Sequence, residues 1–354
     1  MPVTGDGVAC LPCTGMVGRF ALLALIHLSQ GKPPGFLYVH NSFGIGYIWS
    51  REQIGALARR NDALYAAEYL FTERMLSDPL LRSPYLSNAS LFYVPTWAVF
   101  ATSNNAYLKN RGHYLSLINK MSAASADFNA TWSRNKTAHV FFFAGDKGAC
   151  AVNRGPTFMT HWGLTVPWKH MVYLPPDYRP PENPNDVENL PCADGNDVIV
   201  PPNVGGMKVP PQATPPERYE CELFFAGAPN YTLGRSSACG DPLHDKGWQR
   251  CYAQGLREVV FQQHQDRPGY CLIPHGERKG YDLARKSRFC LAPSGEGFGN
   301  RLSLSMLAGC VPVIIQPHVL QPLQDVLPYR RFSLSFNRSE LPTMHLRLAQ
   351  ISSR

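Results

Sequence analysis

A chain of 354 residues is too long for one hydrophobic core, and an apolar fraction of 44% excludes a largely disordered chain, so we expect two domains of about 150 residues each. The formal net charge is +8, but no run of Lys and Arg exceeds two residues, which argues against a nucleic-acid-binding protein. A diffuse positive charge suits a nucleotide diphosphate or an acidic polysaccharide equally well.

Residues 1–32 form a separate N-terminal segment. Within it, Met16–Leu28 is apolar, but Arg19 interrupts it and it is shorter than the roughly 20 residues that a membrane-spanning helix needs. It resembles a degenerate signal anchor or the apolar region of a signal peptide, and an ordinary buried helix explains it equally well. Both interpretations stay open.

From residue 33 onward, short apolar runs alternate with stretches of helical periodicity. In the first half we predict strands at Phe36–His40, Ala89–Pro95, His139–Phe143 and Asp197–Val200, and helices at Glu52–Asn61, Leu64–Met75 and Leu108–Met121. Strands that alternate with helices at this pitch indicate βαβ units and a parallel sheet.

A proline-rich stretch, Pro175–Pro216, separates the two halves of the chain. We place the domain boundary near Pro202, which gives domains over residues 33–202 and 203–354. In the second half we predict strands at Leu223–Gly227, Arg288–Pro293 and Val311–Ile315, and helices at Gly255–Gln263 and Asn300–Ala308.

A glycine-rich loop joins the last predicted helix to the strand before it. Ser294, Gly295 and Glu296 open this loop, and Arg301 falls in the first turn of the helix. Glycines at the carboxyl end of a strand let the backbone approach a ligand, and the helix N-terminus adds unpaired N–H groups and a positive dipole. The pattern favours a diphosphate site, although a tight turn alone explains such a loop about as often.

The same region carries a family resemblance. Ser287–Pro293, Gly295, Arg301 and Ala308–Ile315 resemble the signature of exostosin-like glycosyltransferases, family 47. Further elements of this family are similar to other stretches in the same order: Leu91–Pro95, Val140–Gly148, Asp197–Pro202, Leu223–Gly227 and Gly255–Arg257. Together the matches cover most of the chain.

The resemblance implies an α/β fold with two Rossmann-like domains that face a cleft, the GT-B type, the first domain on the acceptor side and the second binding the nucleotide sugar. It implies inverting transfer of a sugar from a UDP donor to a cell-wall or extracellular glycan, with no cofactor. Arg257, Arg288 and Arg301 are the candidate diphosphate ligands, with Ser294, Gly295 and Glu296 beside them. No D-x-D triad occurs, which agrees with a mechanism that needs no metal, because arginines and a helix dipole offset the leaving charge.

Asp146 is the candidate catalytic base. It follows a predicted strand in the turn Ala144–Gly148, and a carboxylate suffices to deprotonate an acceptor hydroxyl. A turn-capping role is the alternative. His40, His139 and His161 are rival bases, each of which is more often structural.

One departure from the family pattern favours a second hypothesis. Leu304 stands where the family has a glutamate, and in related two-domain transferases a carboxylate there holds the donor ribose. A non-catalytic relative that binds glycans or joins a complex of transferases is therefore the alternative function. A third candidate, an NAD-binding oxidoreductase, lacks the expected G-x-G-x-x-G between a first strand and helix.

Cysteines and glycosylation motifs favour a secretory compartment. The chain has ten cysteines, among which Cys290 and Cys310 are expected to be structural, while their pairing stays open. Five N-x-S/T motifs begin at Asn88, Asn129, Asn135, Asn230 and Asn337. Together with the resemblance, they predict the lumenal side of the Golgi membrane.

Overall fold

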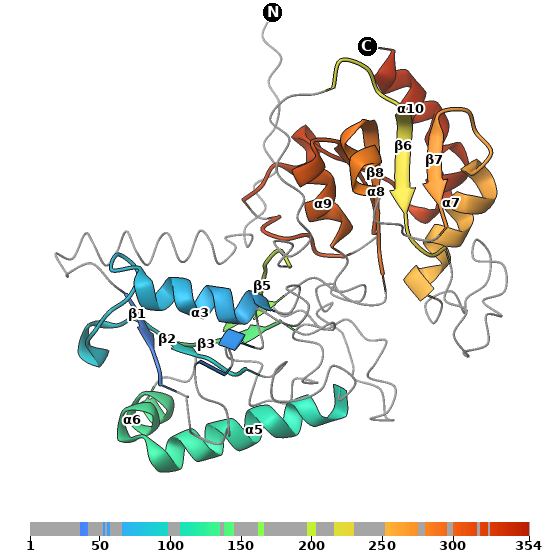
Figure 1. Cartoon of the computed structure of the whole chain (residues 1–354). Helices are drawn as coiled ribbons and strands as arrows, with labels where there is room; N and C mark the ends of the chain where they lie inside the picture. Colours follow the sequence, from blue (N-terminus) through green and yellow to red (C-terminus); the bar gives the residue numbers. More distant parts are fainter. Residues whose placement is uncertain are drawn as a thin grey trace, which may run out of the picture.

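The structure is a computed structural model, and it describes residues 36–41, 52–53, 55–56, 66–97, 107–134, 138–144, 162–165, 197–202, 216–229, 252–274, 280–295, 300–316, 319–324 and 326–353. The chain forms two five-stranded sheets, and every strand pair in both sheets is parallel. The first sheet uses residues up to Ile199 and the second begins at Cys221, so each sheet is built from its own part of the chain (Figure 1). The predicted boundary near Pro202 falls between them.

The first sheet has the strand order β1-β2-β3-β4-β5. Its strands are β1 (Leu37–Val39), β2 (Leu91–Val94), β3 (His139–Phe143), β4 (Trp162–Thr165) and β5 (Asp197–Ile199). Helix α3 (Ala67–Ser77) lies over one face, and α5 (Tyr107–Ala124) and α6 (Ala126–Arg134) lie over the other (Figure 1). A short 3-10 helix, η2 (Leu86–Asn88), precedes β2.

Strand β3 shows why this sheet is buried on both faces. Successive side chains of a strand point to opposite faces, and every residue of β3 is apolar except His139. Val140 and Phe142 pack in the cluster beneath α3, whereas Phe141 and Phe143 pack in the cluster beneath α5 and α6. A continuous apolar run of this kind is typical of a parallel sheet covered by helices on both sides.

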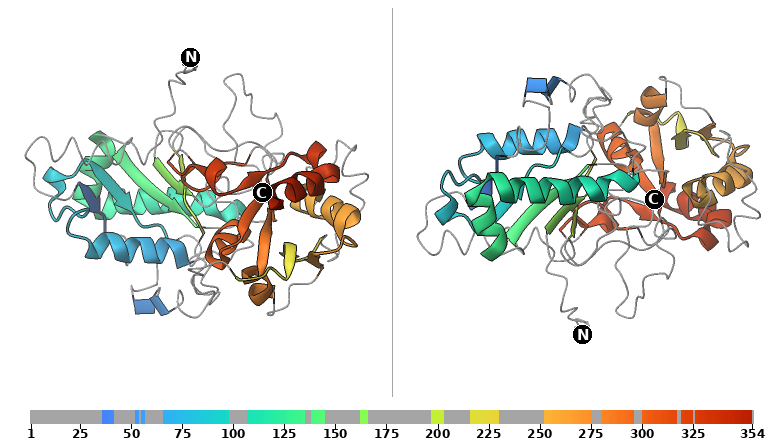
Figure 2. Two further views of the ribbon diagram at one scale, coloured as in Figure 1. Left: turned by 90° about the horizontal axis from the view of Figure 1, so that it is seen from above. Right: turned by 90° about the horizontal axis from the view of Figure 1, so that it is seen from below.

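The second sheet has the order β10-β9-β8-β6-β7. Its strands are β6 (Cys221–Ala226), β7 (Tyr270–Ile273), β8 (Ser287–Pro293), β9 (Val311–Ile315) and β10 (Leu334–Ser335). Its helices are α7 (Leu256–His264), α8 (Gly280–Arg285), α9 (Arg301–Ala308) and α10 (Met344–Ser352), with 3-10 turns η8 (Tyr252–Gly255), η9 (Tyr329–Arg331) and η10 (Arg338–Thr343). Figure 2 shows this half, yellow to red, beside the first half.

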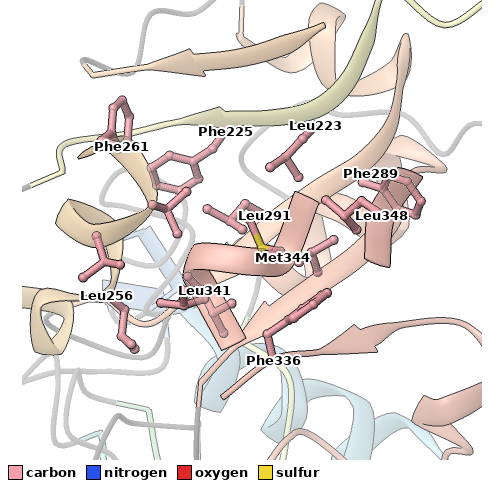
Figure 3. Close-up of a cluster of buried hydrophobic side chains, with 14 residues drawn as sticks. Leu223, Phe225, Leu256, Phe261, Phe289, Leu291, Phe336, Leu341, Met344 and Leu348 are labelled. Carbon is pink, nitrogen blue, oxygen red and sulfur yellow. The ribbon is translucent and has the colours of Figure 1, made fainter. Parts of the chain in front are cut away.

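Helices cover both faces of the second sheet. Phe225 and Leu291 pack with Leu256 of α7 and Leu348 of α10 in the largest cluster of buried side chains (Figure 3). On the opposite face, Phe224 packs with residues of α8 and α9. The second half is therefore a doubly wound α/β/α unit.

The strand order places a topological switch point between β6 and β8. From β6 the chain adds β7 on one side, then returns to add β8 and β9 on the other. Ligands of open α/β sheets bind at the carboxyl ends of the strands where the order reverses. The described strands of the first sheet run in sequence order and contain no such reversal. The expected ligand site is therefore at the carboxyl ends of β6 and β8.

Two disulfides lie on one face of the second sheet. Cys221–Cys271 joins β6 to β7, and Cys290–Cys310 joins β8 to the residue before β9. All four cysteines belong to the cluster under α8 and α9. The expectation that Cys290 and Cys310 are structural agrees with this pairing.

One segment of the second half returns to the first sheet. The backbone N–H of Leu323 donates to the carbonyl of Ile199 at 2.8 Å, and the Leu323 side chain packs on the cluster beneath α3. Beside this contact lies an apolar cavity of about 620 Å³, whose wall includes Phe71 of α3, Pro202 after β5 and Met306 of α9. The cavity is thus shared by the two halves of the chain.

The predicted elements that the structure describes are confirmed within a few residues, whereas most of the predicted helix Glu52–Asn61 lies outside the described residues. The α-helices and strands that the sequence did not predict are α6, β4, β7, α8, β10 and α10, and the short 3-10 helices η2, η8, η9 and η10 were not predicted either. In the part of the chain that the structure describes, no helix is long and apolar enough to cross a membrane. Met16–Leu28 lies outside the described residues.

Candidate functional site

Arg257 joins the two strands at the switch point. It is buried in the first turn of α7, and its Nε donates to the carbonyl oxygen of Ser294, after β8, at 2.9 Å. Its Nη1 donates to the carbonyl of Ala228, after β6, at 3.2 Å. One guanidinium therefore fixes the spacing between the carboxyl ends of β6 and β8.

The guanidiniums of Arg257 and Arg301 both lie near the aromatic ring of Phe225. The Arg257 Cζ is 5.2 Å from the centre of the Phe225 ring, and the Arg301 Cζ, from the first residue of α9, is 5.6 Å from it. Each cation is attracted to the negative face of the ring, which offsets part of the repulsion between the two positive charges. Both guanidiniums therefore lie within 6 Å of the centre of one ring, beside the carboxyl end of β6.

Gly227 leaves the room that this arrangement needs. A Cβ at this position would lie 3.0 Å from Cζ of Phe225 and 3.3 Å from Nη2 of Arg301. Both distances are tighter than most carbon contacts in proteins, so a side chain here requires the ring or the guanidinium to shift by a few tenths of an ångström. The glycine at the end of β6 is thus part of the site.

Ser294 and Gly295 lie at the same edge, directly after β8. Both are buried, and the Ser294 Oγ has no hydrogen-bond partner among the described residues. An unpaired buried hydroxyl costs free energy unless a ligand or water completes it. The N-terminus of α9 begins six residues later and directs its positive dipole to this edge.

The structure brings together Arg257, Ser294, Gly295 and Arg301 and does not bring Arg288 to them. Arg288 lies near the start of β8, at the opposite edge of the sheet from Ser294. Its Nε is 3.3 Å from a carboxylate oxygen of Glu222, and its guanidinium lies 4.9 Å from the Tyr219 ring centre. Asp146, His161 and Glu296 lie outside the described residues.

Two of the rival bases are enclosed in the first domain. His40 and His139 are buried with their rings stacked at 5.9 Å, and both Nε2 atoms lie within 3.4 Å of the Thr131 hydroxyl. Burial, and secondarily the neighbouring His139, lowers the pKa of His40 to about 3. Both rings also pack edge-on against Phe128 of α6, so they belong to the buried core of the first half, whereas the switch point lies in the second sheet.

Leu304, which replaces the expected glutamate, is buried one turn after Arg301 with 5% of its surface exposed. Among the described residues, no group of His, Cys, Asp and Glu side chains is arranged to hold a metal ion. Sequence reasoning missed Phe225 and Gly227 as site residues. The sequence feature that could have indicated them is a glycine directly after a strand rich in aromatic residues. A glycine in this position often marks a place where a ligand approaches the backbone closely.

The comparison with known proteins identifies the family. Residues 36–351 match the description "Exostosin GT47 domain". The chain belongs to this family. The resemblance that the loop Ser294–Arg301 suggested is thereby confirmed.

Relatives of this family are plant glycosyltransferases by name. A probable beta-1,4-xylosyltransferase of Arabidopsis thaliana is 24% identical over 304 residues, which is 81% of this chain and 65% of that protein. A probable glucuronoxylan glucuronosyltransferase of the same plant is 24% identical over 309 residues, 82% of this chain and 59% of that protein. The chain thus spans less than two thirds of these relatives.

Proposed function

We propose that this exostosin-family chain is a glycosyltransferase that moves a sugar from a UDP donor to a cell-wall or extracellular glycan. The observation that carries the proposal is the pair of guanidiniums, Arg257 and Arg301, at the ring of Phe225 beside the switch point. Family membership and the names of the relatives support the reaction class.

The donor diphosphate binds at this edge in the proposal. Arginine presents planar, charge-assisted donors that match phosphate oxygens. Ser294 adds a hydroxyl that lacks a partner among the described residues, and the N-terminus of α9 adds a positive dipole. These groups stabilise the negative charge that grows on UDP as the bond between the sugar and the phosphate oxygen breaks.

The remaining steps of the proposal concern the acceptor. An acceptor hydroxyl attacks the sugar carbon from the face opposite UDP, which inverts its configuration, and its proton passes to the carboxylate of Asp146. Arginines and the helix dipole take the place of a metal, so transfer is expected to persist in a chelator. We also propose that the two sheets form the two lobes of a GT-B cleft, which their parallel strands and the doubly wound second sheet support.

Calorimetry of UDP binding tests the site directly. Arg301→Ala is expected to weaken UDP binding at least about tenfold, because a charge-assisted hydrogen bond contributes about 1.5–3 kcal/mol. Arg218→Ala is the matched control, since this exposed arginine precedes β6 at the opposite edge of the sheet. Equal UDP affinity in wild type and Arg301→Ala would contradict the proposal.

The alternative is a non-catalytic relative that binds glycans or assembles with other transferases. The buried Leu304 favours it, because no carboxylate from this position reaches a donor ribose. Protein that binds the glycan acceptor but neither binds UDP nor consumes a UDP-sugar would establish this alternative.

We place the protein on the lumenal side of the Golgi membrane. Two disulfides support an oxidising compartment, and the sequon residues Asn129 and Asn337 are exposed. Endoglycosidase treatment of the protein from its own cells is expected to shift its mobility. If all five sequons stay unmodified and the cysteines are reduced, the assignment fails.

A further inference from the structure

A further cavity, of about 720 Å³, lies in the first half of the chain, between α6 and the turn over residues 84–90. The turn precedes β2, and α6 ends before β3 begins, so both walls reach the edge of the sheet where these strands start. A volume of this size is typical of sites for small ligands. We call it the α6 cavity.

Two aromatic rings of the sheet line the α6 cavity. Tyr38 of β1 and Phe92 of β2 are register partners, and both are half-buried. Both rings contact the ring of the buried His40, Tyr38 edge-on at 5.2 Å and Phe92 at 6.0 Å. His40 in turn packs edge-on against Phe128 of α6. The two rings are therefore supported from behind by the core of the first half.

A third ring, that of Tyr85, lies on the turn and is open to solvent, with 65% of its surface exposed. Its backbone is nevertheless fixed. The carbonyl of Tyr85 accepts hydrogen bonds from the hydroxyl of the buried Ser83 at 2.7 Å and from the backbone N–H of Asn88 at 3.2 Å. An exposed tyrosine on a fixed turn loses little conformational freedom when it binds a ligand, because few torsions remain to be ordered.

The polar side chains of the α6 cavity include both acceptors and donors. Asp127, Ala130, Thr131 and Arg134 recur at helical spacing, so they share one face of α6. The carboxylate of Asp127 can only accept hydrogen bonds, and the guanidinium of Arg134 can only donate them. Both are exposed, and among the described residues neither they nor the hydroxyl of Ser90 has a hydrogen-bond partner.

The other hydroxyls of α6 and the turn are used within the protein. The hydroxyl of Ser87 donates to Oδ1 of Asn88 at 3.2 Å, and that of Thr131 donates to the carbonyl of Phe128 at 2.9 Å. One carboxylate and one guanidinium leave the described lining without net charge, which favours a neutral ligand. The rest of the lining is apolar and consists of Pro84, Leu86, Ala89 and Ala130.

A sugar ring matches this combination of side chains. Its C–H face is apolar and is attracted to the negative face of an aromatic ring, while its hydroxyls both donate and accept hydrogen bonds. A proline helix, which aromatic-lined cavities also bind, has no N–H to donate to the carboxylate of Asp127. Asp127 and Arg134 are two helical turns apart, about 10 Å along the helix axis, so the cavity has room for more than one sugar ring.

We propose that the α6 cavity is a second sugar-binding site, which holds neutral sugar units of a glycan away from the site of transfer. Its lining belongs entirely to the first half of the chain, whereas the proposed diphosphate ligands Arg257 and Arg301 belong to the second. The proposal thus goes beyond the transfer reaction. Binding of a glycan in the α6 cavity requires no UDP.

Two variants test the site. Tyr85→Ala removes the exposed ring, and Asp127→Asn replaces one acceptor oxygen with an NH₂ group of nearly the same shape. Leu346→Ala and Asp266→Asn are the matched controls, because both residues are exposed on the second half and lose the same kind of group. Thermal unfolding confirms that all four variants are folded.

Affinities of the full chain for cellotriose, xylotriose, maltotriose and acetyl-hexaproline amide are measured by NMR titration, and that for UDP by calorimetry. We expect wild type to bind at least one trisaccharide. Tyr85→Ala should weaken this binding about fivefold, through the lost ring contact, and Asp127→Asn about tenfold, through the lost charge-assisted hydrogen bond. The two control variants should bind like wild type, and all four variants should keep the UDP affinity of wild type.

Three results would overturn the inference. The first is a wild type that binds no trisaccharide, or binds one that Tyr85→Ala and Asp127→Asn hold equally well. The second is tighter binding of the proline peptide, which would assign the α6 cavity to a protein segment. The third is trisaccharide binding only after endoglycosidase treatment, which would place the protein's own N-linked glycan in the cavity.

The outcome for UDP is independent of these results. Trisaccharide binding that depends on Tyr85, in a protein that does not bind UDP, would sink the proposed diphosphate site and support the α6 cavity. UDP binding that depends on Arg301, in a protein that binds no trisaccharide, would do the reverse.

Discussion

Arg257 and Ser294, 37 residues apart in sequence, meet through a hydrogen bond of 2.9 Å from the guanidinium Nε to the main-chain carbonyl. The contact holds the start of the glycine-rich loop against α7. The same guanidinium also donates to the carbonyl of Ala228, which follows β6. Arg257 therefore links the end of β6 to the loop that we assign to the diphosphate. Arg257 thus has two roles: it supplies a positive charge, and its two hydrogen bonds hold the ends of β6 and β8 together.

Arg257→Lys separates these two roles. Lysine keeps the positive charge, but its single ammonium cannot reach both carbonyls in the fork geometry of a guanidinium. We expect a loss of about 1–3 kcal/mol in the free energy of unfolding, measured by urea titration, because a buried carbonyl loses its partner. Arg218→Lys should change stability by less than about 0.5 kcal/mol, as exposed substitutions do. Equal stability of wild type and Arg257→Lys would show that the two hydrogen bonds of the guanidinium do not contribute to the free energy of unfolding.

Gly227→Ala tests the spacing at the Phe225 ring. The added methyl lies 3.0 Å from Cζ of Phe225, so we expect a cost of about 1–3 kcal/mol and weaker UDP binding. The double variant Gly227→Ala with Phe225→Leu removes the obstructing ring edge. Measured by urea unfolding, its loss should be smaller than the sum of the two single losses, and strict additivity would argue against the clash.

Removal of either of the two disulfides that the described residues form should lower stability by a similar amount. By loop entropy, the 20-residue loop of Cys290–Cys310 and the 50-residue loop of Cys221–Cys271 contribute about 3 and about 4 kcal/mol. Paired Cys→Ser variants are compared with wild type by urea unfolding without reductant. With reductant the differences should shrink, because all proteins then lack the bonds. A variant as stable as oxidised wild type would contradict the pairing.

The lowered pKa of the buried His40 leads us to expect a loss of stability in mild acid. Its folded pKa of about 3 lies below the usual 6.5, so the unfolded chain binds a proton that the folded chain excludes as pH falls from about 6.5 to about 3. The free energy of unfolding should therefore fall over this range, and His40→Gln should flatten the decline between pH 7 and pH 5. Parallel pH profiles for the two proteins would show that His40 does not titrate on unfolding.

The sequence predicted long apolar elements well and short or mixed ones poorly. Strands β3 and β9 begin and end where their apolar runs do, because runs bounded by turn residues leave little choice. Strand β4 escaped notice since Gly163 interrupts a four-residue strand. Strand β7 escaped because its four-residue run is too short to distinguish from a loop.

The candidate site was predicted in part. Ser294, Gly295 and Arg301 lie close together because they belong to one local motif, a glycine-rich loop between a strand and a helix. Arg257 is 37 residues from Ser294, and only the family resemblance of Gly255–Arg257 pointed to it. Arg288 shows the limit of this reasoning. It lies in the same motif, but a strand of seven residues carries it to the far edge of the sheet. Contacts between residues remote in sequence, such as the hydrogen bond from Leu323 to Ile199, leave no trace in periodicity.

Among the described residues, two disulfides lie on one face of the second sheet, and this position has a consequence for local opening of the second half. Both bonds secure the face under α8 and α9, while α7 and α10 are held to the opposite face by side-chain packing. A reductant should therefore destabilise the face under α8 and α9 more than the face under α7 and α10. Amide hydrogens of α8 and α9 should exchange faster with deuterium after reduction, whereas those of α7 and α10 should keep more of their protection, so that one sheet reports two levels of local stability.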